Sequence, residues 1–327
     1  MITIGVDAHK RMHMAVAVDG VGREIARWRG ANSIAGWQEL TAWAAALGPG
    51  CRWGIEGAWN YGRALAQHLV AAGAEVYEVN PRWTAEGRRH ARRRDKNDRL
   101  DARAVALYVQ REAAALTAIV AEDDTTVLEL LATERDALVA EATRLRNQLH
   151  QQLLHLDPEY AAHLPSPRTQ GGLLALAGYI SPDPCPLRQQ RAAGVRRLAQ
   201  RLRLAVEQAK ALAAQIRSLA AQRYARLTTI CGISLLTAGA LAGILGPGQR
   251  FAGNAQLAAF AGVAPLEASS AGRVRHRLNR GGNRRLNAIL YRIALSQARH
   301  SPQAQAYLAR RVSEGNTPRR MMCDTGV

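Results

Sequence analysis

The chain has 327 residues, of which 48% are hydrophobic, so it is long enough to form two or three domains with cores of their own. It contains 44 Lys and Arg residues but only 26 Asp and Glu residues, which gives a formal net charge of +18. Such an excess is greater than solubility requires and predicts a polyanionic partner such as a nucleic acid. No apolar run is long enough to cross a membrane, and the scattered cysteines show no metal-ligand spacing. We therefore expect a cytosolic protein without membrane contact, a disulfide framework or structural zinc.

The N-terminal region alternates short apolar runs with segments of helical periodicity. The elements predicted in this region are strands at 1–7, 14–18 and 24–28, a helix at 33–47, a strand at 52–56, a helix at 61–72 and a strand at 75–79. The first three strands follow one another directly and predict an antiparallel meander. Three meandering strands followed by helix, strand, helix and strand is the order of a ribonuclease-H-like α/β domain.

This order of elements predicts that four acidic residues lie close together. Asp7 and Glu56 each end a strand, so their side chains are expected to approach one another at the carboxyl ends of neighbouring strands. Asp98 and Asp101 lie three residues apart on one face of a predicted helix. Carboxylates gathered in this way need a cation, and a pair of Mg²⁺ ions would suit phosphoryl transfer. The alternative for Asp98 and Asp101, which lie inside a basic run, is a solvated salt-bridge face.

Beyond residue 111 the pattern becomes mainly helical. Leu and Ala residues at heptad spacing predict long helices of the coiled-coil type at 125–156 and 198–219, with a Pro- and Gly-rich connection between them. These helices can pair with one another or with the helices of another subunit, and the sequence does not decide between the two arrangements.

The C-terminal region predicts shorter helices. Residues 227–245 resemble a helix-hairpin-helix whose turn at Gly232 would offer backbone N–H groups to a phosphate. Further helices are predicted at 251–264 and 286–298. The composition of this region therefore favours an all-α domain after the α/β domain.

The positive charge is concentrated in two runs. Between Glu267 and Glu314 there is no acidic residue, and arginine at such density suits bidentate phosphate contacts. The predicted nucleic-acid-binding residues lie in this block and in the run before Asp98: Arg92, Arg93, Arg94, Lys96, Arg273, Arg275, Arg277, Arg280, Arg284 and Arg285.

Two serines lie where this basic block begins. Ser269 and Ser270 occupy a small-residue turn, and a serine flanked by arginines has the surroundings of a nucleophile for phosphoryl transfer. The simpler interpretation is that both are turn residues, because serine is common in turns and no histidine lies at a spacing that identifies it as their general base.

Several segments resemble a known family. GVDAHK, GIEGAWNYG, VNP and KNDRLDARAVA resemble the acidic motifs of the DEDD transposases of the insertion-sequence 110 family. ICGIS, RFAGNAQLAAFAGVAP, SSAGRVR and RGGNRRLNAILY resemble its second conserved domain. The resemblance implies α/β followed by all-α architecture, divided as follows: a RuvC-like DEDD domain at 1–115, a coiled-coil helical linker at 116–225, a helical transposase domain with the catalytic serine at 226–312 and a tail at 313–327.

The resemblance also implies an activity. Members cut and rejoin the DNA strands of an insertion sequence, guided by a structured bridge RNA that pairs with donor and target DNA. By position, Asp7, Glu56, Asp98 and Asp101 would hold Mg²⁺, and Ser270 would form a transient phosphoserine link. The family's composite site joins two subunits, so we expect a homodimer that becomes a tetramer on DNA, in the prokaryotic cytosol at the nucleoid.

The chain departs from the family in two places. Ala271 stands where the family usually has Gly, which leaves Ser269 as a second candidate nucleophile. Members also commonly continue past this C-terminus, which raises the question of a truncated copy. Two alternatives to the recombinase stay open: a metal-dependent nuclease resembling a Holliday-junction resolvase, in which Ser270 is structural, and an inactive nucleic-acid binder from a decayed element.

Overall fold

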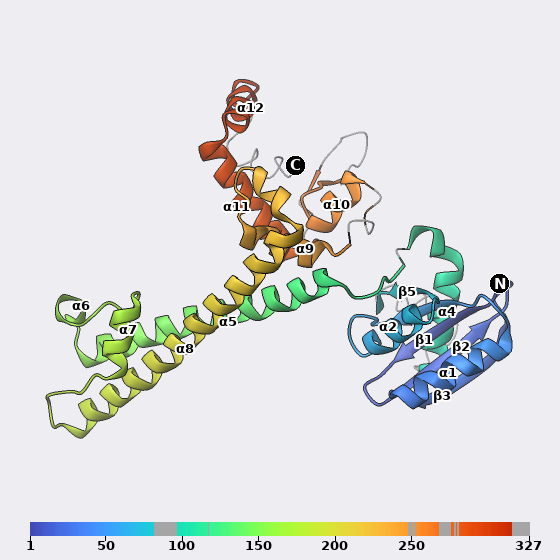
Figure 1. Cartoon of the computed structure of the whole chain (residues 1–327), viewed down its shortest axis with the longest axis horizontal. Helices are drawn as coiled ribbons and strands as arrows, with labels where there is room; N and C mark the ends of the chain where they lie inside the picture. The colour runs from blue at the N-terminus through green and yellow to red at the C-terminus, as the bar shows by residue number, and fades with distance from the viewer. Residues whose placement is uncertain are drawn as a thin grey trace. The chain divides into compact units, whose positions relative to one another are not determined.

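The computed structural model describes most of the chain, namely residues 1–81, 97–116, 118–247, 251, 253–267, 276–277, 279 and 281–315. The chain divides into two compact units, Met1–Glu122 and Asp123–Val327. The first unit contains the sheet and the second is mainly helical (Figure 1). The finer division of the second unit into a linker and a transposase domain stays a prediction.

The first unit is built on a five-stranded sheet of order β3-β2-β1-β4-β5. The strands are β1 (Thr3–Ala8), β2 (Met12–Val18), β3 (Glu24–Ala31), β4 (Arg52–Glu56) and β5 (Glu75–Val79). β2 pairs antiparallel to β1 and to β3, whereas β4 pairs parallel to β1 and to β5. This confirms the predicted mixed α/β domain and its strand order. β2 and β3 are longer than predicted because they pair along their whole length, with Met12 opposite Ala31.

The helices of this unit are α1 (Ile34–Leu47), α2 (Arg63–Ala71) and α4 (Asp98–Glu112), which is followed by the 3₁₀ helix η1 (Ala113–Ala115). α1 begins as predicted at the cap Ser33, whose side chain accepts a hydrogen bond from the Gly36 N–H. α1 and α2 pack on one face of the sheet, against Ile4, Val6 and Ile55. α4 packs on the other face, where Ala102 and Ala106 lie against β2 and Val105 and Val109 lie against β5.

The second unit begins with a long helical hairpin. α5 (Asp124–Leu156) and α8 (Pro186–Arg223) run side by side and antiparallel (Figure 1). Leu128 packs near Ile216 toward one end, and Leu153 packs near Val195 toward the other. The hairpin therefore uses the intramolecular pairing that the sequence left open. The short helices α6 (Tyr160–His163) and α7 (Gln170–Ala177) lie in the connection.

The start of α8 differs from the predicted start of this helix. The sequence predicted a helix from residue 198, whereas α8 begins at Pro186. Proline is tolerated in the first turn because the N–H that it lacks would have no intrahelical partner there. Ala192 and Val195 are buried against α5, so the apolar seam starts before the first leucine of the predicted heptads.

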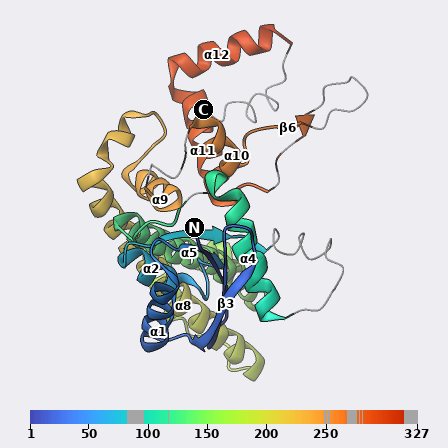
Figure 2. The ribbon, with the colours of Figure 1, turned by 90° about the vertical axis from the view of Figure 1, so that its right-hand side faces the viewer.

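The rest of the second unit is a cluster of shorter elements: η2 (Ala225–Thr229), α9 (Leu235–Leu245), α10 (Asn254–Ala261), β6 (Leu266–Glu267), β7 (His276–Arg277), α11 (Arg284–His300) and α12 (Pro302–Ser313). Leu241, Leu286 and Ile289 contribute to its core. Figure 2 shows α12 leaving α11 at a bend, which lies at Ser301.

This cluster corrects two further predictions. The element before the Gly232 turn is the short 3₁₀ helix η2 rather than the first α-helix of a helix-hairpin-helix. A Cβ on Gly232 would meet Ser296 and Ile293, so the turn packs against α11. α12 was not predicted, although its proline in the first turn is a typical start signal. Within the described residues, no helix combines the length and the apolarity needed to cross a membrane.

Candidate functional site

Asp7 and Glu56 lie side by side at the carboxyl ends of neighbouring strands. They are partners in the parallel register of β1 and β4. Paired residues of parallel strands point to the same face of a sheet, so both carboxyl groups lie on one face. Asp7 is 7% exposed, and Glu56 is half-buried. The structure thus brings these two predicted site residues together.

Two glycines on the same face allow α4 to approach the sheet closely. Gly5 and Gly54 are also partners in the β1–β4 register, two residues before the acids. A Cβ on Gly5 would lie 2.1 Å from the Ala102 carbonyl oxygen, and a Cβ on Gly54 would lie 2.5 Å from a methyl carbon of Val109. The α4 backbone therefore packs directly on the backbone of β1 at Gly5, and the Val109 side chain occupies the space over Gly54.

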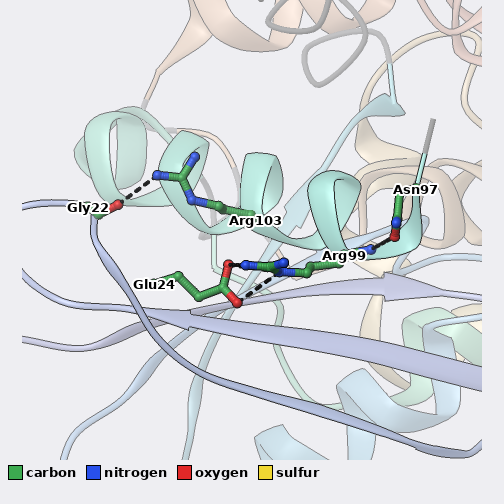
Figure 3. A network of polar contacts seen from close by, with 5 residues as sticks. All are labelled: Gly22, Glu24, Asn97, Arg99 and Arg103. Atoms are coloured by element: carbon green, nitrogen blue, oxygen red, sulfur yellow. Dashed lines mark hydrogen bonds and ion pairs between the residues drawn. The ribbon is translucent and has the colours of Figure 1, made fainter. Parts of the chain in front are cut away.

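The first turn of α4 is fixed by polar contacts (Figure 3). The Asn97 side chain accepts a hydrogen bond from the Arg99 N–H and caps the helix. The Arg99 guanidinium makes two-pronged hydrogen bonds to Glu24 of β3, from Nε to Oε1 and from Nη2 to Oε2, each at 2.9 Å. One turn later, Arg103 donates to the Gly22 carbonyl oxygen. These contacts hold the helix start, and with it Asp98 and Asp101, in place over the sheet.

Asp98 and Asp101 meet Asp7 at this end of the sheet. His9 Nε2 lies 3.1 Å from Asp7 Oδ2 and 3.7 Å from Asp98 Oδ1. One ligand atom from each of these three residues lies within 4.8 Å of the others. Asp98 is exposed, whereas Asp101 is 5% exposed and raises the pKa of Asp7 through its charge.

His9 is a site residue that the sequence analysis missed. It lies two positions after Asp7, at the end of β1. Because strand side chains alternate between faces, residues two apart share a face, and this spacing was the available signal. His9 falls between the strands predicted at 1–7 and 14–18.

The pKa of Asp7 reflects its burial and the charged groups around it. Burial raises the pKa of Asp7, His9 opposes the rise, and the charges of Asp101 and Asp98 add to it. A divalent cation would relieve this repulsion, and carboxylate oxygens are the ligands that Mg²⁺ prefers. The residues present therefore fit such an ion, with Asp7 and Asp98 as its nearest oxygen donors and His9 as an available nitrogen donor.

The remaining predicted residues divide into two groups. Outside the described residues lie Ser269, Ser270, Arg92, Arg93, Arg94, Lys96, Arg273, Arg275 and Arg280. Arg277 and Arg284 are described and exposed. Arg285 is engaged within the second unit: its guanidinium lies 3.0 Å from Asp136 and donates to Thr133 of α5. Arg285 therefore joins α11 to α5, a role that the sequence did not indicate.

Comparison with solved structures and curated proteins gives the following relatives. RuvC of Thermus thermophilus in complex with a Holliday junction substrate is 13% identical, with a TM-score of 0.30, over 36% of this chain and 99% of that chain. A 43.6 kDa protein of insertion element IS110 from Streptomyces coelicolor is 34% identical over 37% of this chain and 30% of its own length. The transposase for insertion sequence element IS1328 from Yersinia enterocolitica is 27% identical over 70% of this chain and 66% of its own length. The chain thus spans less than a third of the first of these two curated relatives and about two thirds of the second.

Two family models match the chain in sequence order. Residues 4–158 match the model for transposases of the IS110 DEDD type, and residues 224–309 match the model for transposases of the IS116/IS110/IS902 family. The first range contains all four acidic residues of the site, and the second contains both candidate serines. Since the two models describe the same family and together match most of the sequence, the chain belongs to the IS110 family of transposases.

Proposed function

We propose that this protein is a DNA transposase of an insertion sequence that cuts and rejoins strands through a phosphoserine intermediate. One observation carries the proposal: acidic residues far apart in the sequence converge at one end of the sheet, with Asp7 beside Glu56 in register and joined to Asp98 through His9. Carboxylates that gather in this way, in a chain of this family, are suited to phosphoryl transfer.

In this proposal the acids and the serine have separate roles. Asp7, Glu56, Asp98 and Asp101 hold Mg²⁺, which supplies electrostatic stabilisation of the charge that develops on phosphate oxygens. The Ser270 oxygen forms a bond to phosphorus while a strand P–O bond breaks, and the released DNA hydroxyl takes the serine proton. In the second half, the hydroxyl of another strand attacks the phosphoserine and returns the proton to serine.

This scheme conserves the energy of the phosphodiester bond. No ATP is then needed, and the sequence contains no GxxxxGK[ST] run. The protein's partners in the proposal are donor DNA, target DNA and a structured guide RNA, gripped in part by Arg277, Arg284 and the neighbouring arginines. A dimer, and a tetramer once assembled on DNA, would bring the acids of one subunit to the serine of another.

A second candidate function is a metal-dependent nuclease that uses water and resembles a Holliday-junction resolvase. The observation that favours it is that Asp7, His9 and Asp98 come together within the first unit alone. A third candidate, an inactive nucleic-acid binder, requires only the positive charge.

One experiment separates these candidates. Ser270→Ala, Ser269→Ala and Asp98→Asn are compared in a plasmid recombination assay, with and without the transcript of the non-coding DNA that flanks the gene. A serine recombinase loses strand exchange and its SDS-resistant protein–DNA complex in Ser270→Ala, retains both in Ser269→Ala, and loses activity in Asp98→Asn. If Ser270→Ala still cuts DNA at the wild-type rate, the protein is a nuclease; if Asp98→Asn changes nothing, the metal site is wrong.

A further inference from the structure

The α5–α8 hairpin is divided into two parts of different charge. We call residues 142–156 and 186–206 the distal half, and residues 124–141 and 207–223 the proximal half. The proximal half contains six acidic and four basic residues, not counting histidine. The distal half contains no Asp or Glu, and its eight arginines are Arg144, Arg146, Arg188, Arg191, Arg196, Arg197, Arg201 and Arg203. This concentration lies outside the two basic runs that the sequence analysis singled out.

The distal half contains a cavity between its two helices. This cavity has a volume of about 430 Å³ and is lined by apolar and polar side chains: Leu187, Gln190, Arg191, Arg197, Leu198 and Arg201 of α8 and Gln152 of α5. Gly194 of α8 also lines the cavity, and its lack of a side chain leaves space between Arg191 and Arg197. Guanidinium and amide groups around such a cavity are donors suited to phosphate oxygens.

The positive charge of this surface is only partly neutralised within the chain. Arg188 lies 3.0 Å from Asp183, Arg201 lies 3.6 Å from Glu141, and Arg203 lies 3.8 Å from Glu207. Arg191 donates to the backbone oxygen of His155, which orients its guanidinium and leaves its charge in place. Among the residues that the structure describes, Arg197 has no carboxylate within ion-pair distance.

We propose that the distal half of the hairpin binds the phosphodiester backbone of a nucleic acid, with Arg197 and Arg201 as its central contacts. The fifteen residues of α5 in this half extend about 22 Å at 1.5 Å per residue, room for about six phosphates of one strand. This surface is additional to the site proposed above and does not depend on the chemistry of Ser270 or of the acids.

A second copy of the chain would be a poorer partner. The only acidic surface of the hairpin is its proximal half, where acidic residues exceed basic residues by two, against eight arginines in the distal half. Pairing of two hairpins would therefore leave most of the arginine charge uncompensated, whereas a nucleic acid carries one charge per phosphate.

The test uses the full-length protein and two matched double variants. Arg197→Ala/Arg201→Ala removes two exposed charges from the distal half, and Lys210→Ala/Arg217→Ala removes two exposed charges from the proximal half of the same helix. Fluorescence anisotropy with a random duplex of about 30 base pairs, as DNA and as RNA, measures affinity against salt concentration. The distal variant is expected to bind about tenfold more weakly, with a salt slope shallower by about two, whereas the control changes little.

The DNA and RNA arms show which backbone the surface prefers. Arg197→Lys/Arg201→Lys should recover most of the lost affinity, and far-UV circular dichroism should be the same for all variants. Equal losses in the distal and proximal variants would overturn the proposal, because only net charge would then matter. So would unchanged nucleic-acid binding together with an altered sedimentation coefficient in the distal variant, since the surface would then join copies of the chain.

Discussion

The two faces of the sheet in the first unit are packed in different ways. On the α1 and α2 face, Ile4, Ile55 and Leu65 are fully buried in a layer of large apolar side chains. On the α4 face, Gly5 meets the helix backbone directly, and Gly54 meets the side chains of Val109 and Val105. The first face stabilises the unit by burying apolar surface, and the second brings α4 close enough for its acids to reach those of the strands.

This difference shows how one sheet serves two purposes. Large side chains on both faces would hold α4 farther from β1, and Asp98 would lie beyond the reach of His9 and Asp7. The α4 face therefore buries smaller side chains, such as Ala102 and Ala106, and also places charged groups, whereas the α1 and α2 face buries larger side chains. The following predictions test each side of that comparison.

The largest effect is expected from Asp7→Asn. If Asp7 holds the cation, strand cleavage of a supercoiled plasmid in Mg²⁺ should fall about 1000-fold, equivalent to about 4 kcal/mol. Burial raises the pKa of Asp7 in the folded state above its pKa in the unfolded state. The folded state therefore loses stability as the pH rises from the lower of these two pKa values to the higher. Without cations the variant should therefore melt at a higher temperature than the wild type at neutral pH. Glu39→Gln, an exposed change on α1, is the control, and retained cleavage in Asp7→Asn would contradict the proposed site.

The next largest effect is expected from Gly5→Ala. Its Cβ would lie 2.1 Å from the Ala102 oxygen, so α4 must move away from the sheet. Overpacking of this kind costs about 2 kcal/mol, measured as the free energy of unfolding in urea. Gly20→Ala is the matched control, since a Cβ there would meet nothing within 4 Å. If both variants were equally stable, the close packing of α4 would not be what positions its acids.

The same comparison explains which parts of the fold the sequence could predict. Alternating apolar residues and turn signals located all five strands, and their order placed Asp7 beside Glu56. The sequence also predicted that the helix carrying Asp98 and Asp101 would bring further acids to this site, and Asp98 does lie near Asp7. What the spacing could not show was the role of Gly5 and Gly54, since their effect depends on a helix distant in the sequence.

Other features were missed for related reasons. His9 was not identified as a site residue, because its contact with Asp98 joins residues from separate elements. The basic distal half of the hairpin was not recognised, because its arginines belong to two helices that only the fold brings together. The start of α8 was placed late because proline was taken as a breaker rather than as a first-turn residue. Ser270 lies outside the described residues, so its role stays a prediction.

A smaller effect is expected when the cation is added or removed. Mg²⁺ at ten times its dissociation constant should raise the free energy of unfolding of the first unit by about 1.4 kcal/mol. EDTA should reverse this gain. Asp98→Asn should remove most of it, because Asp98 supplies one of the clustered oxygen atoms, and Glu39→Gln should leave it unchanged. Urea unfolding with and without Mg²⁺ measures the difference, and an equal response of wild type and Asp98→Asn would exclude Asp98 as a ligand.

The smallest effect concerns a histidine on the opposite face from the acids. His13 of β2 is fully buried and alternates with Ala15 and Ala17, which pack on the α1 and α2 side. Burial lowers the pKa of His13, so the unfolded state takes up a proton first as the pH falls. The free energy of unfolding should therefore fall as the pH drops through the histidine pKa of the unfolded state, about 6.5. His13→Gln should make the free energy of unfolding less dependent on pH between about pH 7 and 5. Urea unfolding at both pH values, with the exposed His300→Gln as control, measures the difference; parallel curves for wild type and His13→Gln would show that the buried imidazole does not contribute.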